Sequence, residues 1–278
     1  MAEKIGVIAG NGQFPFLVLD SARKQNVDIV VAAIKEEASP EIESAGFPVH
    51  WLRLGELGKL VKIFRKAGVG KAIMAGQVKH VQIFSAGIPD MTMIKMLAGL
   101  KQKNTDSLIG GAARVLEENG ITLLDSSSLI EPHLAAPGNL TRRGLSKSEQ
   151  ADVDYGRPIA RKIAGMDIGQ TIIVRNRAVV AVEAMEGTDE AILRAGELAR
   201  KKNLTIIKVS KPQQDMRFDI PVIGIVTIEN MIACGATALV IDAGRTLVFD
   251  REAIRQKADK HGIAIVALPF NGGYGRDE

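Results

Sequence analysis

The chain has 278 residues, of which 46% are hydrophobic and 24% charged, a composition typical of a globular protein with one large domain or two moderate ones; we expect two. Its longest apolar runs, at 178–182 and 263–268, fall far short of the ~20 residues of a membrane-spanning helix, so we expect a cytoplasmic protein. A net charge of +4 with only 4% aromatic residues argues against a nucleic-acid platform. The single cysteine, Cys234, excludes an intramolecular disulfide and stands in an apolar run, where a buried thiol is expected.

Residues 1–130 alternate short apolar runs with amphipathic stretches. The runs that predict strands lie at 5–9, 29–33, 49–52, 72–75 and 122–124. Apolar residues spaced by three and four predict helices at 16–24, 57–67 and 108–118. This alternation predicts an N-terminal Rossmann-like α/β domain with a doubly wound parallel sheet.

Residues 131–150 lose this alternation and are rich in Pro, Gly and Ser, so we interpret them as a connector to a C-terminal mixed α/β domain at 151–278. In this second half we expect a helix from residue 148 that is interrupted at Gly156-Arg157-Pro158, and a hairpin that turns at Asn176-Arg177. The remaining expected elements are helices at 188–202, 226–233 and 251–260, strands at 205–209, 238–241 and 246–249, and a disordered tail at 271–278.

The most informative segment is residues 211–224, KPQQDMRFDIPVIG, which places charged and amide side chains between two prolines. Pro212 and Pro221 disfavour a helix and predict a rigid extended loop. In an extended chain Asp215, Arg217 and Asp219 share one face, which suits a hydrated Mg²⁺ beside a phosphate that the arginine holds. The alternative is a solvated loop in which Arg217 pairs with a neighbouring aspartate.

Two glycine turns follow predicted strands in the first half. The segment AGNGQFP at 9–15, with Gly10, Asn11, Gly12 and Gln13, would aim backbone amides and a helix N-terminus at a phosphate or uridine. Proline replaces the third glycine of the dinucleotide fingerprint, which disfavours a dehydrogenase. Gly76 and Gln77 repeat the pattern after the fourth strand, so the two turns could form one cleft; tight turns without a ligand are the alternative.

Two further turns lie in the second half. Thr188 begins a predicted helix after a strand, among Glu183, Glu186 and Asp189. Gly244 and Arg245 form the next turn along the chain. Both turns could converge on the 211–224 loop, whereas a capped helix N-terminus and a hairpin turn would explain them without a ligand.

Two surface features bear on partners. The methionine-rich region 81–97 suits an acyl-chain groove, although the core of a helix is the favoured interpretation. A basic cluster at Lys59, Lys62, Arg65 and Lys66 suits an anionic partner or is simply a solvated helix face. His80 is one of four scattered histidines, none spaced for zinc with another, so it is expected to be a surface or packing residue.

Several blocks, in chain order, resemble the LpxI family, the UDP-2,3-diacylglucosamine pyrophosphatases of lipid A synthesis. They are IAGNGQFP at 8–15, WLRLG at 51–55, MAG at 74–76, VEA at 182–184, GTD at 187–189, KPQQDMRFDIP at 211–221 and AGRT at 243–246. Together they cover nearly the whole chain, which makes the joint resemblance far more specific than any single block.

The resemblance implies Mg²⁺-dependent hydrolysis of the pyrophosphate in UDP-2,3-diacylglucosamine, which gives UMP and 2,3-diacylglucosamine 1-phosphate (lipid X). The essential aspartate of the family maps to Asp219 or to Asp215, the implied metal ligands, with Arg217 as a further catalytic residue. The implied substrate contacts are Gly10, Asn11, Gly12, Gln13, Gly76, Gln77, Thr188, Lys211, Gln214, Gly244 and Arg245.

A substrate with two acyl chains further implies transient contact with the cytoplasmic face of the inner membrane, for which the basic cluster at 59–66 is a candidate. The oligomeric state stays open, a homodimer included. A pyrophosphatase for a soluble nucleotide sugar and a non-catalytic sensor of a phosphorylated sugar are the alternative functions.

Overall fold

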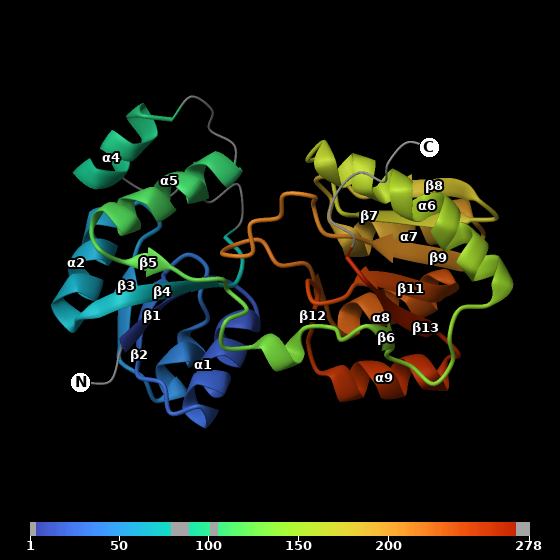
Figure 1. The fold of residues 1–278 in the computed structure, drawn as a ribbon, viewed down its shortest axis with the longest axis horizontal. Coiled ribbons are helices and arrows are strands. Elements are labelled where there is room, and N and C mark those ends of the chain that lie inside the picture. Colours follow the sequence, from blue (N-terminus) through green and yellow to red (C-terminus); the bar gives the residue numbers. More distant parts are fainter. Residues whose placement is uncertain (1–3, 79–88, 101–104, 271–278) are drawn as a thin grey trace. The chain divides into compact units, whose positions relative to one another are not determined.

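Residues 4–78, 89–100 and 105–270 of the chain are described in a computed structural model (Figure 1). The chain divides into two compact units. The first unit comprises Met1–Ile130 and the short segment Met216–Phe218, and the second comprises Glu131–Asp215 and Asp219–Glu278. The predicted fold class, a parallel α/β domain followed by a mixed α/β domain, is confirmed. Our expectations for His80, for part of the methionine-rich region and for the tail at 271–278 lie outside the described residues.

The first unit is built on a five-stranded parallel sheet with the order β3-β2-β1-β4-β5. The strands are β1 (Lys4–Ala9), β2 (Ile29–Ile34), β3 (Val49–Leu52), β4 (Val69–Ala75) and β5 (Thr122–Leu123). The helices are α1 (Phe14–Lys24), α2 (Leu57–Ala67), α4 (Met91–Ala98), α5 (Thr105–Glu118) and the 3₁₀ helix η1 (Pro40–Ala45). Because the strand order reverses between β1 and β4, the turns that follow these two strands lie at the switch point of the sheet.

The packing of this unit follows from its apolar pattern. Every residue of β2 is buried, as expected for a central strand covered on both faces. Helix α2 buries Leu57, Leu60, Val61 and Phe64, which share one face at helical spacing. Gly6 lies directly beneath the Phe64 ring, where a Cβ atom would stand 2.6 Å from Cζ. The glycine therefore lets the ring pack flat on β1.

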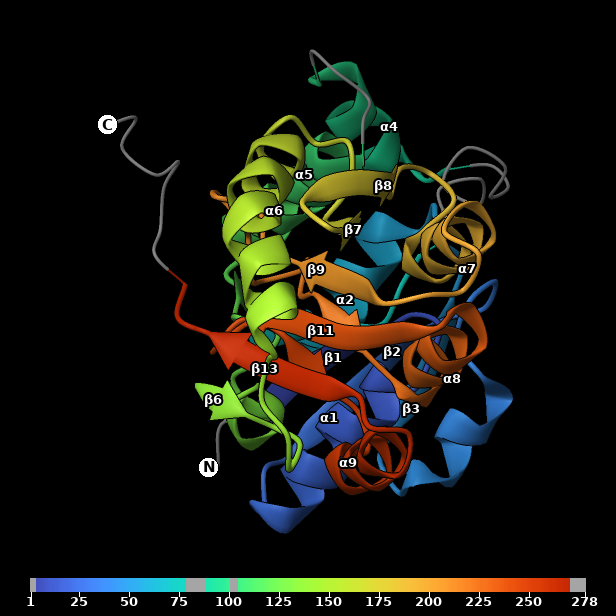
Figure 2. The same ribbon diagram turned by 90° about the vertical axis from the view of Figure 1, so that its right-hand side faces the viewer.

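The second unit is built on a six-stranded mixed sheet with the order β6-β13-β11-β9-β7-β8. Its strands are β6 (Gly138–Asn139), β7 (Thr171–Arg175), β8 (Ala178–Val182), β9 (Leu204–Lys208), β11 (Ala236–Asp242) and β13 (Ala264–Leu268). The helices are α6 (Lys147–Gly165), α7 (Thr188–Leu198), α8 (Ile225–Cys234), α9 (Arg251–Lys260) and the 3₁₀ helix η2 (Glu131–His133). Figure 2 shows α6 on one face of this sheet and α7, α8 and α9 on the other.

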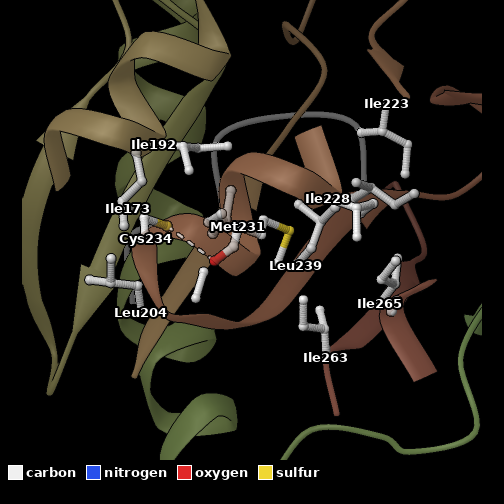
Figure 3. Close-up of a cluster of buried hydrophobic side chains, with 14 of the residues drawn as sticks. Ile173, Ile192, Leu204, Ile223, Ile228, Met231, Cys234, Leu239, Ile263 and Ile265 are labelled. Carbon is white, nitrogen blue, oxygen red and sulfur yellow. Dashed lines mark hydrogen bonds between the residues drawn. The ribbon is translucent and has the colours of Figure 1, made fainter. Parts of the chain in front are cut away.

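The largest apolar core of the second unit lies under α7, α8 and α9 (Figure 3). Cys234 belongs to this core and is 1% exposed, and its thiol donates to the Met231 carbonyl at 3.4 Å. Burial raises the pKa of this thiol. The thiol is therefore kept protonated in an apolar site, which agrees with the expected buried cysteine.

The expected break at Gly156-Arg157-Pro158 is wrong, because α6 runs without interruption from Lys147 to Gly165. Gly156 lies so close to the sheet that a Cβ atom would stand 2.5 Å from Cδ1 of Ile207. Contact with the sheet keeps the helix continuous through this point, although Pro158 removes one backbone donor. The packing of α6 on the sheet therefore overrides the helix-breaking tendency of the Gly156-Arg157-Pro158 segment.

The strand expected at 246–249 is present as β12 (Leu247–Val248). It pairs in parallel with β10 (Val222–Ile223) in a separate two-stranded sheet, so the alternative of a hairpin turn before it does not hold. The expectation that the methionine-rich region is helix core holds only in part for α4, because Met93 and Met96 pack on the core although no residue of α4 is fully buried. Within the described residues, no helix is both long and apolar enough to cross a membrane.

Candidate functional site

Polar side chains gather at one edge of the second unit's sheet. The parallel strands β9, β11 and β13 all end at this edge. Strand β7 runs antiparallel to both of its neighbours, with Thr171 opposite Lys208, so β7 begins and β8 ends at the same edge. The carboxyl edge of parallel strands is the usual ligand position in α/β sheets. The topology therefore makes this edge the candidate site of the unit.

Lys208 ends β9 and is the first component of the site. Its Nζ donates to Oγ1 of Thr188 at 2.7 Å, and the Thr188 hydroxyl donates to Oε1 of Glu183 at 2.9 Å. Lys208 is only 8% exposed. Burial lowers the pKa of Lys208, while Glu183, Asp189 and Asp219 oppose that shift. A buried cation is thus connected to a carboxylate through one threonine hydroxyl.

Asp219 is the second component. Its Oδ2 lies 3.5 Å from Nζ of Lys211 and 3.5 Å from Nε2 of Gln170. Its backbone N–H donates to the Asp215 carbonyl at 3.0 Å, and its carbonyl accepts from Nε2 of Gln214 at 2.7 Å. The Asp219 carboxylate is therefore fixed among cations and amides at the edge where Lys208 ends β9.

The loop that carries Asp219 is not extended, so the expected alternation of Asp215, Arg217 and Asp219 on one face is wrong. The loop makes turns at 212–213 and 216–218. The Gln214 side chain accepts from the Lys211 backbone N–H at 2.6 Å, and this contact helps to close the first turn. Side-chain and backbone bonds within the loop outweigh the extended bias of its prolines.

Residues Met216–Phe218 of this loop belong to the first unit. The backbone N–H of Ser126 donates to the Met216 carbonyl at 2.9 Å, and Ser126 Oγ lies within hydrogen-bonding distance of the Arg217 carbonyl. The Arg217 guanidinium forms an ion pair with Glu117 at 3.2 Å. Phe218 packs against the core of the first unit. The loop therefore changes units after Asp215 and returns at Asp219.

A cationic cluster follows β11 at the same edge of the second unit. Asp242 is fully buried, and its carboxylate accepts from Arg157 at 2.6 Å and from the Ser210 backbone N–H at 2.8 Å. The Arg245 guanidinium stacks on the Phe270 ring, 3.9 Å from its centroid. The contact with Ser210 joins the end of β11 to the end of β9. Arginines from α6 and from the turn after β11 thereby extend the positive charge along this edge.

The residues at this edge offer oxygen ligands that fit Mg²⁺. Oε2 of Glu183 and Oε1 of Gln170 are buried and have no hydrogen-bond partner in the described part of the chain. Asp219 supplies a carboxylate beside Gln170. No group of three or more His, Cys, Asp or Glu residues that could hold a metal occurs in the described ranges. This set suits Mg²⁺, which takes one or two protein carboxylates and completes its shell with water and phosphate oxygens.

The glycine turns of the first unit are joined to each other. The backbone N–H of Asn11 donates to the Gln77 carbonyl at 2.8 Å, and the Gln77 N–H donates back at 3.0 Å. A Cβ atom on Gly76, whose φ is +93°, would stand 2.5 Å from the Asn11 carbonyl oxygen, and one on Gly10 would stand 2.6 Å from that of Gln77. Both glycines are therefore required for the close approach of the two turns, whether or not a ligand binds.

The N-terminus of α1 lies at these turns. Gln13 occupies the N-cap position of α1, and within the described residues its side chain makes no capping hydrogen bond. Gly12 has a φ of +92° and open space around it. The helix dipole at this N-terminus favours an anion electrostatically.

The predicted site residues thus separate by unit. Gly10, Asn11, Gly12, Gln13, Gly76 and Gln77 lie in the first unit together with Arg217, whereas Asp215, Asp219, Thr188, Lys211, Gln214, Gly244 and Arg245 lie in the second. Our sequence reasoning missed Lys208, Gln170 and Arg157. Lys208 carried a usable signal, because a lysine that ends the apolar run of a buried strand needs a partner.

The second unit is a mixed α/β unit that gathers cations around a carboxylate at its sheet edge, an arrangement that suits a phosphorylated ligand. The chain belongs to the LpxI family. The model of the LpxI N-terminal domain matches residues 4–133, and that of the LpxI C-terminal domain matches residues 136–266. This match confirms the resemblance seen in the sequence blocks.

One relative is the UDP-2,3-diacylglucosamine pyrophosphatase LpxI of Caulobacter vibrioides, which is 30% identical over 275 residues, 95% of this chain and 97% of the relative. Among solved structures, the biotin carboxylase domain of the Hydrogenobacter thermophilus 2-oxoglutarate carboxylase has a TM-score of 0.27 at 13% identity; the match covers 72% of this chain and 42% of that one. The biotin carboxylase subunit of a pyruvate carboxylase is similar, with a TM-score of 0.26, 13% identity and the same coverage. Likeness at this level carries no functional argument.

Proposed function

We propose that the protein hydrolyses the pyrophosphate bond of UDP-2,3-diacylglucosamine, giving UMP and 2,3-diacylglucosamine 1-phosphate, with Mg²⁺ as its cofactor. The observation that carries the proposal is the 30% identity to a UDP-2,3-diacylglucosamine pyrophosphatase over 95% of the chain. The cationic edge around Asp219 supports it, because a pyrophosphate needs positive charge on its oxygens before a nucleophile can approach.

Each residue at the edge has a proposed role. Asp219 is the carboxylate that would hold the metal. Gln170 lies beside it and Glu183 lies at the same edge, and each offers a buried oxygen without a hydrogen-bond partner in the described residues. When bound, Mg²⁺ would lower the pKa of a coordinated water and neutralise phosphate charge. Lys208 and Lys211 would stabilise the negative charge that develops on the phosphate oxygens. In the overall reaction one water adds across the anhydride, its oxygen joins the phosphorus nearer the sugar, and UMP leaves.

We assign Asp215 a supporting role and Asp219 the metal-binding one. Asp215 accepts the Asp219 backbone N–H at 3.0 Å and so shapes the turn that presents Asp219. Arg245 on Phe270 would bind a phosphate oxygen at the same edge. Arg217, which forms an ion pair with Glu117, is proposed to contribute less to charge neutralisation than the lysines.

The test is UMP release from UDP-2,3-diacylglucosamine in mixed micelles, with Mg²⁺ or with EDTA. We expect EDTA to abolish turnover, Asp219→Asn to lower kcat by about 10³-fold, and Asp215→Asn and Arg217→Gln to lower it less. UDP-glucose serves as a non-acylated control, since faster turnover of that substrate would favour a pyrophosphatase for soluble nucleotide sugars. Absence of turnover by the folded wild-type protein with any divalent metal would overturn the proposal in favour of a binding protein.

A binding measurement tests the metal without turnover. Because Asp219 already lies near Lys211 and Lys208, we expect Mg²⁺ alone to bind the free protein weakly. Calorimetric titration should show stronger Mg²⁺ binding when UDP is present, since phosphate oxygens complete the coordination shell. Asp219→Asn should remove that gain, and equal Mg²⁺ affinity with and without UDP would contradict this role.

We further propose that the protein works at the cytoplasmic face of the inner membrane, because a substrate with two acyl chains resides in a bilayer.

A further inference from the structure

A hollow of about 630 Å³ lies along α2 in the first unit, apart from the glycine turns. Its lining includes Gly58, Lys62, Arg65 and Lys66 of α2, Thr92 of α4, and Asn119 after α5. The α2 residues recur at intervals of three and four, so they share one side of the helix. The hollow also reaches Val61, at the border of the buried face of α2 that includes Leu57 and Phe64.

Asp90 fixes the two helices that border this hollow. Its Oδ2 accepts the Gly58 backbone N–H at 2.6 Å, and its Oδ1 accepts the Met93 N–H at 2.9 Å. One carboxylate therefore caps α4 and holds the first turn of α2. Gly58 permits this approach, because a Cβ atom there would stand 2.6 Å from Oγ1 of Thr92. Asp90 therefore fixes the α4 side of the hollow against the first turn of α2.

The hollow carries excess positive charge. Lys62, Arg65 and Lys66 are exposed, and in the described part of the chain none of them has a carboxylate partner. The neighbouring Lys59 differs, because it forms an ion pair with Glu56 at 2.9 Å. Three unpaired cations in one concave surface attract a phosphate group.

Helix α4, which packs against α2, carries exposed apolar side chains. Met91 is 65% exposed and Ile94 is 42% exposed, while Met93 and Met96 pack inward on the core. Exposed apolar residues beside exposed cations are typical of helices that lie in a membrane interface. An acidic protein partner would match the cations alone, whereas a bilayer of anionic lipid matches both features.

We propose that this α2–α4 face docks on an anionic bilayer, with Lys62, Arg65 and Lys66 binding lipid headgroup phosphates and Met91 and Ile94 entering the acyl layer. The inference deepens the proposed function and rests on it for the reason why the protein visits a membrane. The docking surface lies wholly within the first unit, whereas Asp219 and Lys208 belong to the second.

The test is sedimentation of the full-length protein with phosphatidylcholine vesicles, with and without about one-third phosphatidylglycerol, at low and at physiological salt. We expect binding only to the anionic vesicles, and weaker binding as salt rises. The α2 variant combines Lys62→Gln, Arg65→Gln and Lys66→Gln. It should bind anionic vesicles about 100-fold more weakly than the wild-type protein, roughly fivefold for each charge. Replacing Met91 and Ile94 by serine should weaken binding about tenfold through lost apolar contact.

A matched control replaces Lys147, Lys202 and Lys260 of the second unit by glutamine, which removes the same charge from exposed positions. Equal losses of vesicle binding in the control and in the α2 variant would overturn the proposal. Wild-type protein that binds neither kind of vesicle would also overturn it. Binding of poly-glutamate with an affinity equal to that for vesicles would also overturn it, in favour of an acidic protein partner. Hydrolysis in detergent micelles separates this proposal from the proposed function, because the α2 variant should keep full micellar activity while it loses vesicle binding.

Discussion

Lys208 and Thr188 illustrate at the residue scale how a buried charge is accommodated. Lys208 is 8% exposed, so its ammonium group has exchanged most of its water for protein contacts. Thr188 Oγ1 accepts from that ammonium at 2.7 Å and donates to Glu183 at 2.9 Å. One hydroxyl thus gives the ammonium group a hydrogen-bond acceptor and orients the carboxylate, which makes Thr188 a positioning residue.

We predict that Thr188→Val lowers kcat for UMP release by roughly 10²-fold while the protein stays folded, because the Lys208 ammonium loses its fixed orientation. Thr188→Ser should restore most of the activity, since serine keeps the hydroxyl. Steady-state kinetics with micellar substrate and circular dichroism are the measurements. Full activity in Thr188→Val would show that Lys208 needs no such partner.

At the element scale, α6 depends on its N-terminus and on its contact with the sheet. A capping box joins Ser146 and Glu149, and Arg143 adds two bonds to the Glu149 carboxylate at 2.8 and 2.7 Å. Burial would raise the pKa of Glu149, but hydrogen bonds from Arg143, Thr237 and Ser146 outweigh it and hold the pKa at about 2.

The pH dependence of stability follows from this pKa. The folded value of about 2 lies below the ordinary 4.5, so Glu149 stabilises the fold above pH 4.5 and loses that contribution as pH falls toward 2. We predict that Glu149→Gln lowers the free energy of unfolding by about 3 kcal/mol at neutral pH. Urea denaturation should show this difference shrinking below pH 4.5. A difference that does not vary with pH would contradict the assignment.

A second prediction for α6 concerns its contact with the sheet. At Gly156 a Cβ atom would stand 2.5 Å from Cδ1 of Ile207 and 2.8 Å from Cγ2 of Val174. We expect Gly156→Ala to lower the free energy of unfolding by about 2 kcal/mol, as measured by urea denaturation. Gly110→Ala in α5 is the matched control, because nothing lies within 4 Å of its Cβ position. It should stabilise by about 1 kcal/mol through helix propensity alone.

At the scale of the whole molecule, the two compact units are not two continuous segments of the chain. The first unit takes Met216–Phe218 from the middle of the second half. Ser126, which is 1% exposed, binds this segment, and Phe218 joins the core of the first unit. The loop that presents Asp219 is therefore anchored by the folded first unit.

We predict that Phe218→Ala destabilises the first unit by about 3 kcal/mol, although the residue lies far along the chain. Hydrogen exchange of the β4 and β5 amides should speed up, because the core above them is less well packed. Met185→Ala is the control, since Met185 is 94% exposed and its truncation should leave exchange unchanged. Faster exchange confined to the second unit would contradict the anchoring role of Phe218.

The fold class and the family could be predicted from the sequence alone. Periodic apolar runs predict the buried strands of both sheets, because a strand buried on both faces must be apolar whatever its neighbours are. The joint blocks at 8–15, 211–221 and 243–246 indicated the family, which the domain models confirm.

The arrangement of α6, α4 and the loop at 211–221 depends on tertiary contacts and could not be predicted from the sequence. Helix α6 continues through Gly156 and Pro158 because the sheet supports it, and the loop turns because Gln214 and Ser126 bind its backbone. Lys208 acquires its role from Thr188 and Glu183, which come from other elements of the unit. These features depend on contacts between residues far apart in sequence, and local propensity contains no information about such contacts.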